Sequence, residues 1–87
     1  MAKVVVTLKV MPKGLDVDFD RLEREIEKKL SGEVKKEIEN IAFGLRALKF
    51  MFVWDEEDGG TDSLENEIKR IKGVKSVEVI DVRRAIG

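Results

Sequence analysis

The order in which hydrophobic patterns follow one another is the feature that most constrains the fold of this chain. Apolar residues first alternate with a period of two and then recur at helical spacing, and this pairing occurs twice. The resulting order is strand, helix, strand, strand, helix, strand. Two strand–helix–strand units with right-handed crossovers interleave into a four-stranded antiparallel sheet, order 4-1-3-2, with both helices on one face. The sequence therefore predicts an α+β, ferredoxin-like sandwich in one domain, residues 1–87.

The first half of the chain carries clear boundary signals. Residues 3–10 alternate between apolar and mostly polar side chains, which predicts a strand with one buried face. Pro12 and Gly14 follow and should end this strand. A helix is expected after Asp18, the predicted N-cap, and it should close at Ser31–Gly32. The apolar stripe of this helix consists of Phe19, Leu22, Ile26 and Leu30.

The second half repeats the pattern with a different start. Residues 33–40 are charged on one face, which predicts an edge strand, and the apolar run that follows predicts the central strand. A second helix should begin at Thr61 or Asp62, with Glu65 completing a capping box from Asp62. The last strand is expected over residues 75–83.

Composition excludes several kinds of site. The chain has 17 basic and 18 acidic side chains, so we expect no general attraction to nucleic acid or to an anionic membrane. It has no cysteine or histidine, which removes disulfides, thiolate metal sites and nucleophile–base pairs built on imidazole or thiol. No signal peptide or run of roughly 20 apolar residues is present, so we expect a cytoplasmic protein. The abundance of charged residues and the lack of glutamine are typical of hyperthermophile proteins.

Two acidic segments resemble metal sites but are better explained otherwise. Asp16, Asp18 and Asp20 are spaced like the start of a calcium-binding loop, but Arg21 occupies the position where the loop needs glycine. Capping of the following helix explains these aspartates better. The acidic run at residues 55–58 is typical of a solvated turn. We therefore expect no cofactor and no metal.

Phe43 and Gly44 stand at the entrance of the central strand and allow more than one interpretation. They could form a packed turn, with the glycine permitting tight backbone geometry. Alternatively, Phe43 could be presented on a rigid scaffold to enter the pocket of another molecule. The pair also resembles the RNP1 signature of RNA-binding domains, but Leu45 and Leu48 occupy the positions of the further aromatics. A small-molecule-sensing domain stays open by analogy with other proteins of this fold.

Five segments, taken in order, resemble one protein family. They are VVTLKVMP at residues 5–12, IAFGL at 41–45, the acidic run at 55–58, GTD at 60–62 and VIDVRR at 79–84. In this combination and over essentially the whole length, the sequence resembles the archaeal elongation factor 1-beta family. Relatives of this family form the carboxy-terminal exchange domain of the eukaryotic factor.

The resemblance implies a guanine-nucleotide exchange factor for elongation factor 1-alpha, the GTPase that delivers aminoacyl-tRNA to the ribosome. Such a factor would act in translation, on the GDP-bound and nucleotide-free partner, without covalent chemistry, nucleic acid or membrane. In the family, a phenylalanine before the third strand enters a pocket beside the partner's switch region, and by position this is Phe43. A basic residue near the carboxy terminus reaches toward the partner's Mg²⁺ site. Arg84 is the nearest match, with Arg83 beside it, where the eukaryotic relatives have lysine.

The expected partner-binding residues fall into two groups along the chain. They are Ile41, Ala42, Phe43, Gly44, Arg46, Arg83 and Arg84. In the predicted topology, the turn before the third strand and the end of the fourth strand lie at opposite ends of the sheet. We therefore expect Phe43 and Arg84 to be separated by roughly 20 Å, the length of a six-residue strand, unless Phe43 lies well inside the hairpin.

Overall fold

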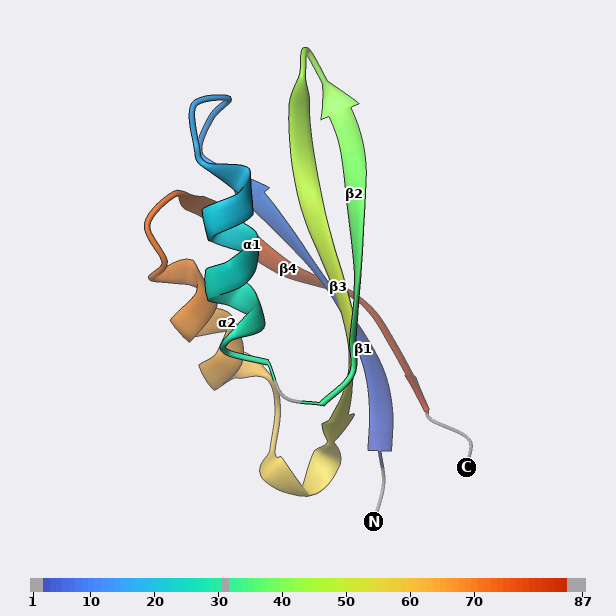
Figure 1. Cartoon of the computed structure of the whole chain (residues 1–87). Helices are drawn as coiled ribbons and strands as arrows, with labels where there is room; N and C mark the ends of the chain where they lie inside the picture. The colour runs from blue at the N-terminus through green and yellow to red at the C-terminus, as the bar shows by residue number, and fades with distance from the viewer. Residues whose placement is uncertain (1–2, 31, 85–87) are drawn as a thin grey trace.

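The sheet and both helices have the predicted arrangement. The computed structural model of the chain describes residues 3–30 and 32–84. Its elements are β1 (Lys3–Pro12), α1 (Phe19–Glu27), β2 (Val34–Ala42), β3 (Leu45–Asp55), the 3₁₀ turn η1 (Glu56–Asp58), α2 (Asp62–Lys69) and β4 (Val74–Arg84). The strands are antiparallel in the order β2-β3-β1-β4, and both helices lie on the same face of the sheet (Figure 1). The α+β, ferredoxin-like fold and the strand order 4-1-3-2 are therefore confirmed.

The core lies between the helices and the face of the sheet that they cover. The alternation along β1 is confirmed, because every second side chain from Val4 to Val10 is buried. Both helices contribute the residues of their apolar stripes, with Leu22 and Ile26 buried on α1 and Leu64 and Ile68 on α2. The largest fully buried side chains are Phe50, Leu8, Leu22, Ile26, Leu48, Ile68, Val6 and Val10.

Both strands of the first half continue past their predicted ends. β1 includes Pro12, which pairs with Val74 of β4 directly after a register shift in the ladder. A proline is tolerated at the end of a strand beside such an irregularity because its missing amide is not needed there. β2 runs to Ala42, so that Phe43 follows the hairpin strand immediately.

Helix α1 ends earlier than predicted. Its last residue is Glu27, whereas the sequence predicted closure at Ser31–Gly32. The amides of Lys29 and Leu30 donate to carbonyls three residues earlier, at 2.9 and 3.1 Å. The final turn is therefore tightened into 3₁₀ geometry, which often ends an α-helix. Ser31 lies outside the described residues.

The capping of α2 also differs from the prediction. The N-cap is Thr61, and Asp62 is the first helical residue. The hydroxyl of Thr61 donates to the carboxylate of Glu65 at 2.8 Å, and no side chain caps the backbone amides. The capping box from Asp62 to Glu65 is therefore wrong. Asp62 and Glu65 still favour the helix, because negative charge in the first turn interacts well with the helix dipole.

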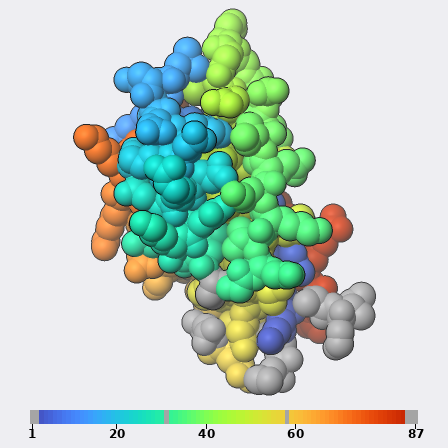
Figure 2. Space-filling model, viewed as in Figure 1, coloured from blue at the N-terminus to red at the C-terminus, as the bar shows by residue number. Residues whose placement is uncertain are grey.

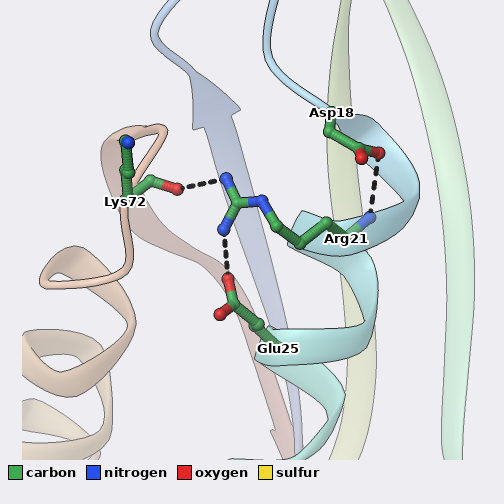
Figure 3. Close-up of polar contacts among 4 residues, drawn as sticks. All are labelled: Asp18, Arg21, Glu25 and Lys72. Carbon is green, nitrogen blue, oxygen red and sulfur yellow. Dashed lines mark hydrogen bonds and ion pairs between the residues drawn. The ribbon is translucent and has the colours of Figure 1, made fainter.

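Arg21 joins the loop before α1 to the turn before β4. Asp18 is the N-cap of α1, as predicted, and it accepts a hydrogen bond from the backbone amide of Arg21 at 3.2 Å. The guanidinium of Arg21 forms an ion pair with Glu25 and donates to the carbonyl of Lys72 at 2.8 Å (Figure 3). The two crossover connections of the fold are thus tied together at one end of the sheet. Neither helix within residues 3–30 and 32–84 is long and apolar enough to cross a membrane.

Candidate partner-binding site

The β2–β3 connection is a two-residue turn of Phe43 and Gly44. Ala42 pairs with Leu45 across it, so the loop contains only these two residues. Their φ angles are 52° and 80°. Positive φ at both central residues defines a type I′ turn, whose twist matches that of the flanking strands. Glycine is expected at the second position, but the first normally holds asparagine, aspartate or glycine.

Phe43 is an unusual residue for this position. Among the described residues it alone combines a side chain with positive φ, a conformation that disfavours L-residues by roughly 1 kcal/mol or more. Its side chain is 98% exposed and so gains nothing from the core. The packed-turn interpretation is therefore wrong. Neither local propensity nor packing explains a phenylalanine here, and strained residues of this kind cluster at functional sites.

The remaining hairpin residues of the predicted site surround this turn. Ile41 is 40% exposed, and Ala42 is also exposed. Arg46 lies one residue into β3, and its guanidinium carbon is 4.4 Å from the centre of the Phe19 ring. This cation–π contact ties the hairpin, just below its tip, to the start of α1. Arg46 therefore supports the hairpin, while Ile41, Ala42 and Phe43 form its exposed tip.

The terminal arginines lie far from this tip. Arg84 pairs with Val4, and Val4 pairs with Trp54 on its other side, so Arg84 lies level with the end of β3. Trp54 lies nine positions after Leu45 on β3, which corresponds to roughly 30 Å of strand. The hairpin tip and the end of β4 accordingly stand at opposite ends of the molecule (Figure 1). The predicted separation is confirmed and is larger than expected, because Phe43 forms the very end of a long hairpin.

The two arginines also face different sides of the sheet. Residues directly opposite each other in an antiparallel pair point to the same face. Arg84 shares its face with the buried Val4, on the helix side, whereas Arg83 is paired with Val5 on the open side. The Nε atom of Arg83 lies 2.9 Å from the Asp81 carboxylate on that face. A partner that docks on one face of the sheet would therefore contact either Arg83 or Arg84, but not both to the same extent.

The open face of the sheet, opposite the helices, carries a cluster of opposite charges across β2, β3 and β1. The carboxylate of Glu39 contacts the Nζ atoms of Lys9 at 3.0 Å and Lys49 at 2.8 Å. The hydrogen bond from Lys49, and then the one from Lys9, lowers the pKa of Glu39 below its ordinary value. The same contact with Glu39 raises the pKa of Lys49. Glu37 also raises the pKa of Lys49, so the two lysines face two carboxylates and form no basic groove by themselves.

The aromatic rings of β3 point away from the open face. Phe50 and Phe52 are buried in the core, and the indole of Trp54 donates to the carbonyl of Gly59 at 2.9 Å. RNA-binding domains of this fold stack bases on aromatics of the open face, and β3 offers none there. Across residues 3–30 and 32–84, no three acidic side chains come together in a way that could hold a metal ion.

Leu15 is an exposed residue near the tip that the sequence did not single out. It lies in the β1–α1 loop, and 69% of its surface is exposed. The signal that could have found it is a large apolar residue between Gly14 and Asp16, in a turn that otherwise needs none. Only the structure brings this loop against the hairpin.

Comparison with known proteins points to one family. Residues 5–85 match the EF-1 guanine nucleotide exchange domain family. A protein of Staphylothermus marinus named Elongation factor 1-beta is 46% identical over 88 aligned positions, covering 97% of this chain and 98% of the relative. Proteins of the same name from Methanothermobacter thermautotrophicus and Saccharolobus islandicus are 45% and 41% identical, each over 97% of this chain and 98% and 97% of the relative.

Proposed function

This chain belongs to the EF-1 guanine nucleotide exchange domain family of translation elongation factors, and we propose that its partner is elongation factor 1-alpha. It binds the GDP-bound GTPase, promotes release of GDP and holds the nucleotide-free state until GTP rebinds. The whole chain, residues 1–87, acts as one exchange-factor domain in the cytoplasm. It works without a cofactor, a membrane or direct contact with nucleic acid.

The observation that carries this proposal is the presentation of Phe43. A bulky aromatic side chain stands almost fully exposed on a strained two-residue turn, at the end of a hairpin that Arg46 ties to α1 just below this turn. Buried aromatic anchors supply a large share of the binding energy at protein interfaces. A rigid hairpin presents such an anchor without the entropy cost of ordering a loop. Phe43 is accordingly the anchor that enters the partner, with Ile41, Ala42 and Gly44 around it.

Exchange needs no covalent chemistry, only differential binding. A factor that binds the nucleotide-free GTPase more tightly than the GDP-bound form must weaken GDP binding by the same ratio. A thousandfold faster release corresponds to about 4 kcal/mol of barrier lowering. One buried aromatic anchor and one charge directed at the Mg²⁺ site are sufficient for an effect of this size.

The roughly 30 Å between the two groups of site residues favours an extended grip on the partner. Phe43 holds one part of the GTPase, while a terminal arginine acts on Mg²⁺ at the other end of the sheet. Arg84 is the better match to the basic residue of the family, and Arg83 is already paired with Asp81.

Nucleotide release from the purified GTPase tests this proposal. Elongation factor 1-alpha loaded with fluorescent GDP is mixed with excess unlabelled GDP, with and without this protein. We expect release to accelerate with increasing concentration of the protein and then to saturate. Unchanged release at every concentration would contradict the proposal, and so would micromolar binding of GDP to this protein alone in calorimetry.

A further inference from the structure

We propose that Leu15 is a second contact residue for the partner GTPase, so that the docking surface is built from two loops. The docking tip, as we define it, consists of Leu15, Ile41 and Phe43. Leu15 and Phe43 together would enter an apolar groove of the partner. This inference rests on the proposed function and deepens it, because it assigns part of the docking surface to the β1–α1 loop.

The β1–α1 loop and the hairpin turn approach each other at Gly44. A Cβ atom built on Gly44 would lie 3.7 Å from the Cδ2 atom of Leu15, which is ordinary van der Waals contact. Both residues line a hollow of about 30 Å³ whose wall also includes Phe19 and Arg46. In the space-filling view, the light-blue atoms of the β1–α1 loop lie beside the yellow-green atoms that follow the hairpin tip (Figure 2). Leu15 therefore lies beside the turn that carries Phe43.

The β1–α1 loop is held in place from its other side. The amide of Lys13 donates to the carbonyl of Gly73 at 2.8 Å, and Arg21 donates to the carbonyl of Lys72 (Figure 3). Val17 packs so closely on Gly73 that a Cβ there would lie 2.9 Å from its Cγ1 atom. These contacts fix both ends of the loop. The exposure of Leu15 is thus a property of a well-held loop, as is that of Phe43 on its hairpin.

The chemistry of the docking tip defines the surface that it fits. Its three side chains are aliphatic or aromatic, and the guanidinium of Arg46, just after the turn, is directed at the Phe19 ring. Large apolar side chains that lie exposed near one another are typical of a protein–protein contact. Because Leu15 lies beside Gly44, the residue that follows Phe43 in the turn, we assign it to the same GTPase. The matching surface should be an apolar groove long enough for two side chains.

The test compares Leu15→Ser with a control that is also exposed but distant. Val53 is 50% exposed on β3, toward the opposite end of the sheet, and Val53→Ser is the control. GDP release is measured over a range of concentrations of each variant. For Leu15→Ser we expect the half-saturating concentration to rise roughly fivefold, the maximal rate to stay near wild type, and the melting temperature to be unchanged. Val53→Ser should leave the half-saturating concentration unchanged.

A direct contact is tested with a photocrosslinking amino acid placed at position 15. Crosslinking to the GTPase, competed away by unlabelled wild-type protein, supports the inference. A wild-type concentration dependence for Leu15→Ser, or an equal loss for Val53→Ser, would overturn it. So would a dimer of this chain in light scattering that Leu15→Ser dissociates, because a second copy would then cover the surface. If the wild-type protein fails to accelerate release, the proposed function itself fails; if only Leu15→Ser behaves like wild type, the inference alone fails.

Discussion

At the scale of single residues, two glycines with positive φ show the difference between backbone strain and steric overlap. Gly59 has a φ of 83°, and a Cβ added there would meet nothing within 4 Å. Gly73 has a φ of 100°, and its added Cβ would come within 2.9 Å of Val17 and 3.3 Å of Arg21. The backbone conformation disfavours a side chain at both positions. Only at Gly73 would the added Cβ also overlap neighbouring side chains.

We expect Gly59→Ala to destabilise the protein by about 1–3 kcal/mol through backbone strain alone, because its φ of 83° and ψ of −162° lie in a region used almost only by glycine. Gly73→Ala should cost at least about 1 kcal/mol more, since Val17 must move and the loop before α1 must shift with it. Urea denaturation of both variants measures the difference. Equal losses would show that the approach of Val17 to Gly73 is looser than the structure indicates.

At the scale of elements, Glu39 connects three strands. It stands on β2 and binds Lys9 of β1 and Lys49 of β3, which places one carboxylate across the open face. Because these contacts lower its folded-state pKa, Glu39 stabilises the fold above its ordinary pKa, and this contribution disappears as the pH falls through the lowered value. All these side chains are solvent-accessible, so the effect should weaken in high salt.

The ion pairs of Glu39 should affect the acid denaturation of the protein. Wild-type stability should fall as the pH drops below about 4.3, the ordinary range for glutamate. Glu39→Gln should be less stable than wild type at neutral pH, and the two should converge at low pH. Glu67→Gln, on the exposed face of α2, serves as the control. Thermal melts from pH 7 to pH 2 would contradict this account if Glu39→Gln and Glu67→Gln gave the same curve.

The sequence predicted the elements well because each has a strong hydrophobic period. Val4, Val6, Leu8 and Val10 could only form one face of a strand, and their burial confirms this. Element ends were less predictable, since hydrogen bonds such as that of Thr61 to Glu65 depend on side-chain rotamers. A turn at Phe43 and Gly44 was predicted, but its two-residue geometry with positive φ at Phe43 was not, because phenylalanine contradicts the residue preference of this turn type. Leu15 became a candidate only when the fold brought its loop to Gly44.

At the scale of the whole molecule, the two candidate contacts lie at opposite ends. The docking tip occupies one end of a molecule that is 42 Å long, and the terminal arginines lie at the other. The docking tip and the terminal arginines are too far apart to contact the same point of the partner. The proposed mechanism therefore requires the GTPase to be held along the length of the sheet.

Arg84→Ala tests the far end of this grip. We expect slower GDP release in excess Mg²⁺, with stability changed by less than about 0.5 kcal/mol because the side chain is exposed. The defect should shrink when Mg²⁺ is chelated, since the chelator then removes the ion. Arg83→Ala is the matched control on the opposite face. Wild-type rates for both variants in excess Mg²⁺ would remove the terminal arginines from the mechanism and leave Phe43 as the main contact.

The central claim is that Phe43 serves to bind the partner although it destabilises the turn. Phe43→Asn tests this claim most directly. Asparagine is favoured at the first position of a type I′ turn, so the variant should melt no lower than wild type, with a gain of up to about 1 kcal/mol. GDP release, measured on the same sample, should slow by roughly tenfold or more because the anchor is lost. An equal or faster release, or a melting temperature well below that of wild type, would contradict the account.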